Sequence, residues 1–97
     1  MLSAKQRSFL GGIASKEAVV THLGKGGPTP AFSAQLGALL ELHELVKVKF
    51  VNFKDDKRTI ADNLAIATKS EVVRLIGNTA IFYRQNPDPE KRFIELA

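Results

Sequence analysis

Segments with the apolar spacing of a helix alternate along this chain with short segments rich in β-branched residues. Strand-like patterns occupy residues 18–23, 45–53, 71–76 and 79–84, and a helix-like pattern precedes each of the first three. Helices between strands favour parallel pairing through right-handed crossovers, whereas Gly77-Asn78 between the last two strands is typical of an antiparallel hairpin. We therefore predict an α/β fold in the order α-β-α-β-α-β-β. It has three helices and a mixed four-stranded sheet, whose strand order the sequence does not define.

Capping residues mark where the three predicted helices begin. Ser3 starts a capping box, and Thr29 before Pro30 pairs an N-cap hydroxyl with a ring whose fixed φ suits the first helical position. Thr59 is predicted to open the third helix, which ends near Lys69. Gly11 and Gly12 weaken the end of the first helix, and the second helix runs to about Leu42. Residues at helical spacing should face the core. They are Leu2, Phe9, Leu10 and Ile13 in the first helix, Phe32, Leu36, Leu39, Leu40 and His43 in the second, and Ile60, Leu64 and Ala67 in the third.

The alternation at residues 45–53 predicts a strand with two unlike faces. Val46, Val48 and Phe50 fall on one side, and Lys47 and Lys49 fall on the other. The first β-branched segment, residues 18–23, is predicted to be a buried strand.

A glycine cluster follows that first strand and precedes the second helix. In Gly24-Lys25-Gly26-Gly27, the glycines let the backbone approach a ligand closely and Lys25 adds a cation, at a helix N-terminus whose free N–H groups favour a phosphate. A tight connecting turn without a ligand explains the same residues equally well. The mononucleotide and dinucleotide phosphate-loop patterns are both incomplete, which disfavours nucleotide hydrolysis.

Composition restricts the chemistry further. The 97 residues have room for one core, so we predict a single domain over residues 1–84 and a tail or edge extension over 85–97. The net charge of +4 favours a polyanionic partner, and the absence of cysteine excludes disulfides and thiolate zinc sites. His22 and His43 lack metal-ligand spacing and no catalytic constellation is present. We predict neither an enzyme nor a bound cofactor or metal. We also expect a cytoplasmic chain that does not bind membranes, with a monomer as the default state.

Several of these segments together resemble the CRM domain, a family named for chloroplast RNA splicing and ribosome maturation. The resemblance covers about residues 3–84. It rests on Lys5-Gln6, on Val19-Val20 leading into the glycine cluster, on residues 43–49 and on residues 76–84. Pro28 departs from the pattern, because the family commonly has a larger apolar residue there.

The resemblance implies a fold similar to the C-terminal domain of bacterial translation initiation factor three. It also implies that the glycine loop and nearby basic residues contact RNA. A lone domain of this length is similar to the bacterial YhbY-type members, which are associated with precursors of the large ribosomal subunit. On this basis we expect a non-catalytic RNA-binding protein whose partner is ribosomal RNA or a pre-large-subunit particle.

The candidate RNA-binding residues share a positive charge or a place in the glycine loop. They are Gly24, Lys25, Gly26, Gly27 and Thr29 at the loop, Lys5 and Arg7 in the first helix, Lys47 and Lys49 on one strand face, and Arg84 at the end of the last strand. The direction of Arg74 is undecided without the strand order. Tyr83 could stack on a base, although core packing is its default role. Two alternatives stay open: a small-phosphate binder or enzyme that uses the same loop, and a protein-interaction module that docks through the sheet edge or the tail.

Overall fold

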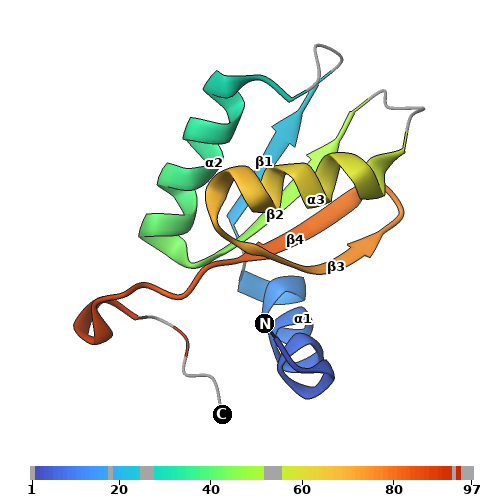
Figure 1. Ribbon diagram of the computed structural model, residues 1–97. Helices are drawn as coiled ribbons and strands as arrows, with labels where there is room; N and C mark the ends of the chain where they lie inside the picture. The colour runs from blue at the N-terminus through green and yellow to red at the C-terminus, as the bar shows by residue number, and fades with distance from the viewer. Residues whose placement is uncertain (1, 18, 25–27, 52–55, 93, 95–97) are drawn as a thin grey trace.

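A four-stranded mixed sheet organises the chain in the computed structural model, which describes all residues except 1, 18, 25–27, 52–55, 93 and 95–97 (Figure 1). The element order is α-β-α-β-α-β-β, as the sequence predicts, followed by a short 3-10 helix. The elements are α1 (Ala4–Glu17), β1 (Val19–Leu23), α2 (Pro30–His43), β2 (Leu45–Phe50), α3 (Lys57–Thr68), β3 (Glu71–Ile76), β4 (Thr79–Tyr83) and η1 (Pro89–Lys91).

The strands lie in the order β1-β2-β4-β3. β1 and β2 are parallel and are joined by α2, whereas β4 is antiparallel to both of its neighbours. The hairpin turn at Gly77 has a φ of +55°, which glycine adopts without steric cost. The most apolar strand, β4, occupies an interior position between β2 and β3, and all of its residues after Thr79 are buried.

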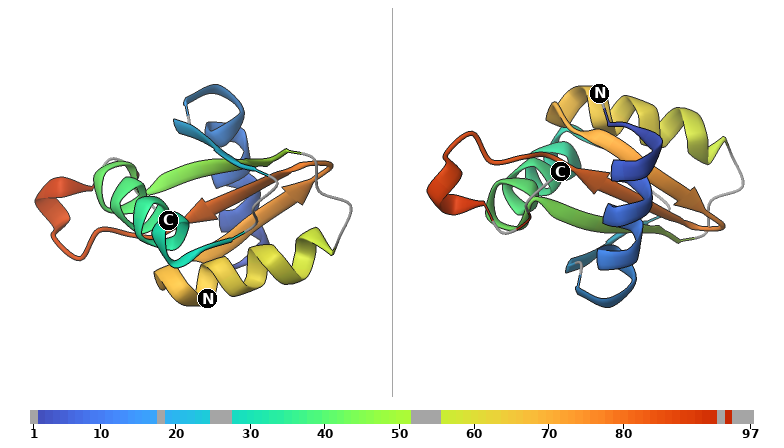
Figure 2. Two further views of the ribbon diagram at one scale, coloured as in Figure 1. Left: turned by 90° about the horizontal axis from the view of Figure 1, so that it is seen from above. Right: turned by 90° about the horizontal axis from the view of Figure 1, so that it is seen from below.

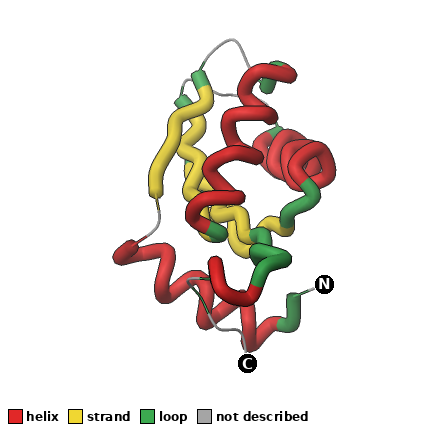
Figure 3. The backbone as a smooth tube through the Cα atoms, turned by 90° about the vertical axis from the view of Figure 1, so that its left-hand side faces the viewer, coloured by secondary structure: helices red, strands yellow, loops and turns green. Residues whose placement is uncertain are grey.

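Helices cover the two faces of the sheet unequally. Figure 3 shows α2 and α3 side by side on one face, and the main core lies beneath them. The three apolar side chains of β2 predicted to share a face, Val46, Val48 and Phe50, pack there against Leu36 of α2 and Leu64 of α3. The predicted alternation of β2 is therefore confirmed.

On the opposite face, α1 crosses the strands and covers only one end of them (Figure 2). Leu10 and Ala14 of α1 are fully buried in a second core that contains Leu45, Ile81 and Tyr83. The helix continues through Gly11 and Gly12 to Glu17, so the glycines do not end it. Phe9, predicted to face the core, is 49% exposed, because the core-facing stripe is centred on Leu10 and Ala14.

Several other boundary or burial predictions are wrong in detail. Ala67 of α3, predicted to face the core, is exposed, and β2 ends at Phe50. α3 begins at Lys57 rather than Thr59, because Asp56 is the N-cap and accepts a hydrogen bond from the Thr59 backbone N–H at 3.2 Å. Hydrogen bonds from Thr59 lower the pKa of Asp56. His43 is exposed at the end of α2, and β1 is an edge strand whose Val20 is 49% exposed.

The described part of the predicted tail or edge extension, residues 85–92 and Ile94, is anchored to the rest of the fold. The Glu44 carboxylate accepts hydrogen bonds from the backbone N–H groups of Asn86 at 2.7 Å and Ile94 at 3.2 Å. Glu44 is fully buried and has a φ of 63°, and the Ile94 side chain is buried in the second core. One buried carboxylate therefore holds the C-terminal segment against the end of the sheet.

Candidate nucleic-acid interface

The part of the sheet that α1 leaves uncovered carries two rows of side chains across the strands. In the right-hand view of Figure 2, this part extends from α1 toward the β3–β4 hairpin. Pairing aligns one row, Val20–Lys47–Ile81–Arg74, next to α1, and a second row, His22–Lys49–Thr79–Ile76, farther out. Residues paired across strands point to the same face, and Ile81 belongs to the core under α1. We call Val20, His22, Lys47, Lys49, Arg74, Ile76 and Thr79 the open face.

Positive charge on the open face is not balanced by acidic side chains that the structure describes. Lys49 and Arg74 are exposed and Lys47 is half-buried, and none of them forms an ion pair with a side chain that the structure describes. The described acidic side chains lie in two other places. Asp56 and Asp62 belong to the N-cap and first turns of α3, which packs on the opposite face of the sheet. The others lie at or beyond the sheet end where β2 begins and β4 ends, and they are Glu41, Glu44, Glu71, Asp88 and Glu90. The open face is therefore suited to an anion.

Arg74 lies directly against the backbone of α1. A Cβ atom at Gly11 would come within 3.1 Å of the Arg74 Cζ and 3.3 Å of its Nη1. Gly11 is thus the residue that lets the guanidinium lie at the border between α1 and the open face. The sequence alone does not predict which face of the sheet Arg74 lies on. Its place depends on the strand order, in which β4 separates β3 from β2.

The glycine loop begins at the same end of the sheet as the outer row. Leu23, the residue before Gly24, pairs with Phe50, and the Leu23 carbonyl accepts a hydrogen bond from the Val51 N–H at 2.9 Å. Thr29 caps α2 as predicted, because its hydroxyl accepts a hydrogen bond from the Phe32 N–H at 3.1 Å. Three residues of the predicted site, Lys25, Gly26 and Gly27, lie outside the described residues.

The two predicted basic residues of α1 lie on different flanks of that helix. Arg7 is one turn before Gly11 and so shares the flank that Arg74 contacts. It is half-buried, and its Nε is buried without a hydrogen-bond partner among the residues that the structure describes. Lys5 is exposed on the flank of Phe9, away from the open face.

Arg84 is separated from the other candidate residues. It follows β4 at the sheet end opposite the glycine loop, where its guanidinium donates to the carbonyls of Thr68 and Gly37 at 2.8 Å each. These contacts join α2 to the end of α3. The structure therefore gives Arg84 a role in packing, and the position of β4 in the sheet explains why it does not converge with Lys47 and Lys49.

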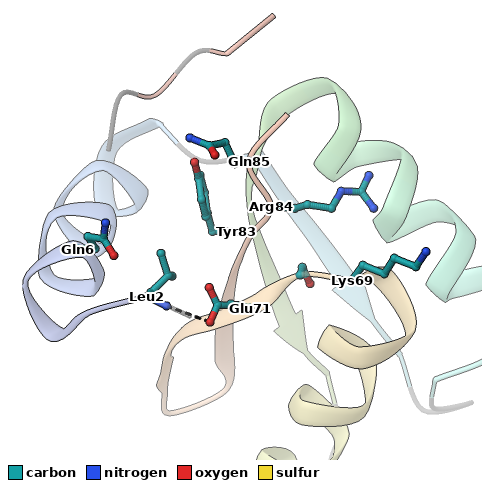
Figure 4. A pocket seen from close by; sticks show the side chains of 8 residues that line it. Leu2, Gln6, Lys69, Glu71, Tyr83, Arg84 and Gln85 are labelled. Atoms are coloured by element: carbon teal, nitrogen blue, oxygen red, sulfur yellow. Dashed lines mark hydrogen bonds between the residues drawn. The ribbon is translucent and has the colours of Figure 1, made fainter. Parts of the chain in front are cut away.

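Tyr83 lines a pocket at this same end of the sheet (Figure 4). There Glu71 accepts a hydrogen bond from the Leu2 backbone N–H at 3.0 Å. Tyr83 is only 3% exposed, and burial, reinforced by the negative charge of Glu44, raises its pKa to about 12. Core packing rather than base stacking is the observed role of Tyr83.

The described residues contain no cluster of three potential metal ligands, and none of their helices is long and apolar enough to span a membrane.

Comparison with known proteins places this architecture in a family. The family model of the CRS1/YhbY (CRM) domain matches residues 2–84. The chain belongs to the CRM domain family. It is similar to the Probable RNA-binding protein YqeI of Bacillus subtilis, with 35% identity over 97 residues that cover 99% of both chains.

Two further comparisons agree with this assignment. An RNA-binding protein of Haemophilus influenzae is 34% identical over 88 residues, which cover 90% of this chain and 89% of the relative. The solution structure of the hypothetical protein SAV1595 from Staphylococcus aureus matches with a TM-score of 0.79 and 33% identity, over 98% of this chain and all of the other. The predicted α/β fold is thereby confirmed.

Proposed function

We propose that this CRM domain is a non-catalytic RNA-binding protein of the cytoplasm. We further propose that its target is ribosomal RNA or an RNA-containing precursor of the large ribosomal subunit. The observation that carries the proposal is the open face, where Lys47, Lys49 and Arg74 share one side of the sheet without a described acidic neighbour. The relatives named above as RNA-binding proteins support the same class of partner.

The glycine loop is the second part of the proposed interface. A backbone phosphate would bind at the N-terminus of α2, which Thr29 caps. The residues that would hold it are Gly24, Lys25, Gly26 and Gly27. The loop leaves β1 beside the outer row of the open face, so one RNA can reach both. Arg7 of α1 would add charge at the rim of the open face, whereas Lys5 lies on the far flank of that helix and Arg84 packs α2 against the end of α3.

Crosslinking in cells that express the chain, followed by sequencing of the attached RNA, tests this function. We expect reads from large-subunit ribosomal RNA to be enriched over a control chain in which Lys47 and Lys49 are both glutamate. Equal recovery of RNA by the two chains would contradict the role of the open face. Enrichment confined to messenger RNA would contradict the ribosomal target.

A further inference from the structure

The open face has few of the side chains with which proteins usually hold single-stranded RNA. Single-strand readers stack splayed bases on exposed aromatic rings. The open face contains no aromatic ring other than the imidazole of His22, and the nearby Tyr83 is buried. Phe9 is exposed, but it lies on the flank of α1 that points away from this face. A chain of unpaired bases would find little to stack on here.

The cations of the open face are instead spread over two separated strands. Lys47 and Lys49 lie on β2, and Arg74 lies on β3, with β4 between them. Two strand spacings separate these cations by about 10 Å. Between them lies the half-buried Thr79, which carries a hydroxyl. A base-paired RNA offers phosphates on two backbones and 2′-hydroxyl groups across a wide, shallow minor groove, which matches a flat surface of this composition.

Arg74 defines the far edge of this surface, and Gly11 fixes its place. A Cβ atom at residue 11 would lie only 3.1 Å from the guanidinium carbon, so the guanidinium would have to shift by a few tenths of an ångström. The absence of a side chain at Gly11 thus leaves room for the charge at the border of the open face, two strands from the lysines.

We propose that the open face selects base-paired RNA, and that Arg74, positioned by Gly11, contacts the second backbone of the duplex. The inference rests on the proposed RNA-binding function and names the structural class of RNA that the same site takes.

Direct competition between RNA forms tests the selection. The probes are an RNA duplex of about 16 base pairs, a non-self-complementary single strand of the same length and a DNA duplex of the same sequence. We expect the wild-type chain to bind the RNA duplex at least about tenfold more tightly than either competitor at equal salt. RNA binding that favours the single strand, or that treats all three alike, would overturn this inference alone. Failure to bind any RNA would overturn it together with the proposed function.

Variants at Arg74 and Gly11 test the positioning. Arg74→Gln should weaken duplex binding about fivefold, as expected for loss of one phosphate contact. Gly11→Ala should weaken it about threefold by displacing the guanidinium, and the double variant should bind no worse than Arg74→Gln alone. Thermal unfolding should show Gly11→Ala to be at least as stable as the wild type, because alanine favours a helix.

Arg58 provides the matched control. It is exposed on α3, where it pairs with Asp62 away from the open face. Arg58→Gln removes the same charge and should leave duplex affinity within about 1.5-fold of the wild type. Wild-type duplex affinity in Arg74→Gln, or an equal loss in Arg58→Gln, would overturn the assignment of Arg74.

Discussion

A chain carrying Lys47→Glu and Lys49→Glu should fold normally and bind RNA about 100-fold more weakly than the wild type at about 0.1 M salt. Each reversal removes a phosphate contact and places a negative charge beside the RNA backbone, and a loss of about tenfold per reversal is a conservative value. Lys49 is exposed and Lys47 half-buried, so neither change empties the core. Fluorescence anisotropy with labelled RNA measures the affinity, and circular dichroism checks the fold.

The control for this experiment reverses two lysines at the other end of the molecule. Lys69 follows α3 and Lys91 ends η1, and both are exposed. Each reversal lowers the charge by two, so both double variants bring the net charge from +4 to zero. We expect the control to lose less than about fivefold in affinity, through long-range electrostatics alone. Equal losses in the two variants would show that total charge, and not the open face, determines binding.

Glu44→Ala should lower the free energy of unfolding by about 3–5 kcal/mol. The carboxylate is fully buried and accepts hydrogen bonds from the backbone of Asn86 and Ile94, so its removal leaves buried donors without acceptors. It also detaches the C-terminal segment from the second core. Urea unfolding, followed by circular dichroism, measures the loss.

Two further variants distinguish the effect of the Glu44 carboxylate on stability from other effects of substitution in this region. Glu44→Gln keeps one carbonyl oxygen to accept a hydrogen bond, so we expect a smaller loss of about 1–3 kcal/mol. Glu41→Ala, at an exposed position three residues earlier in α2, should change stability by less than about 0.5 kcal/mol. The φ of 63° at residue 44 costs alanine and glutamate alike, so backbone strain does not distinguish the variants. A Glu44→Ala chain as stable as Glu41→Ala would contradict the anchoring role.

Much of the fold could be predicted because helix starts and strand faces depend on residues that are close together in the sequence. The alternation in residues 45–53 correctly divided Val46 and Val48 from Lys47 and Lys49, since successive side chains of a strand point to opposite faces. The pair Thr29-Pro30 correctly located the start of α2. At α3 the same reasoning chose Thr59, whereas the N-cap is Asp56, three residues earlier, whose carboxylate accepts a hydrogen bond from the Thr59 N–H.

The site could be predicted only in part, because it depends on which strands are neighbours. Arg74 could not be assigned until β4 was placed between β2 and β3, and nothing in the sequence connects it to Gly11. Arg84 has the same charge as Lys49, yet its strand ends at the opposite side of the sheet. The anchoring role of Glu44 could not be predicted for a similar reason, because its hydrogen-bond partners are 42 and 50 residues away along the chain.

The salt dependence of RNA affinity tests most directly whether the backbone of a nucleic acid is held by these cations. For the wild-type chain and about four neutralised phosphates, the logarithm of the association constant should fall with the logarithm of salt concentration with a slope of about −3. The chain with Lys47→Glu and Lys49→Glu should give a slope shallower by about two. A wild-type slope near zero, or the same slope in both chains, would contradict the account.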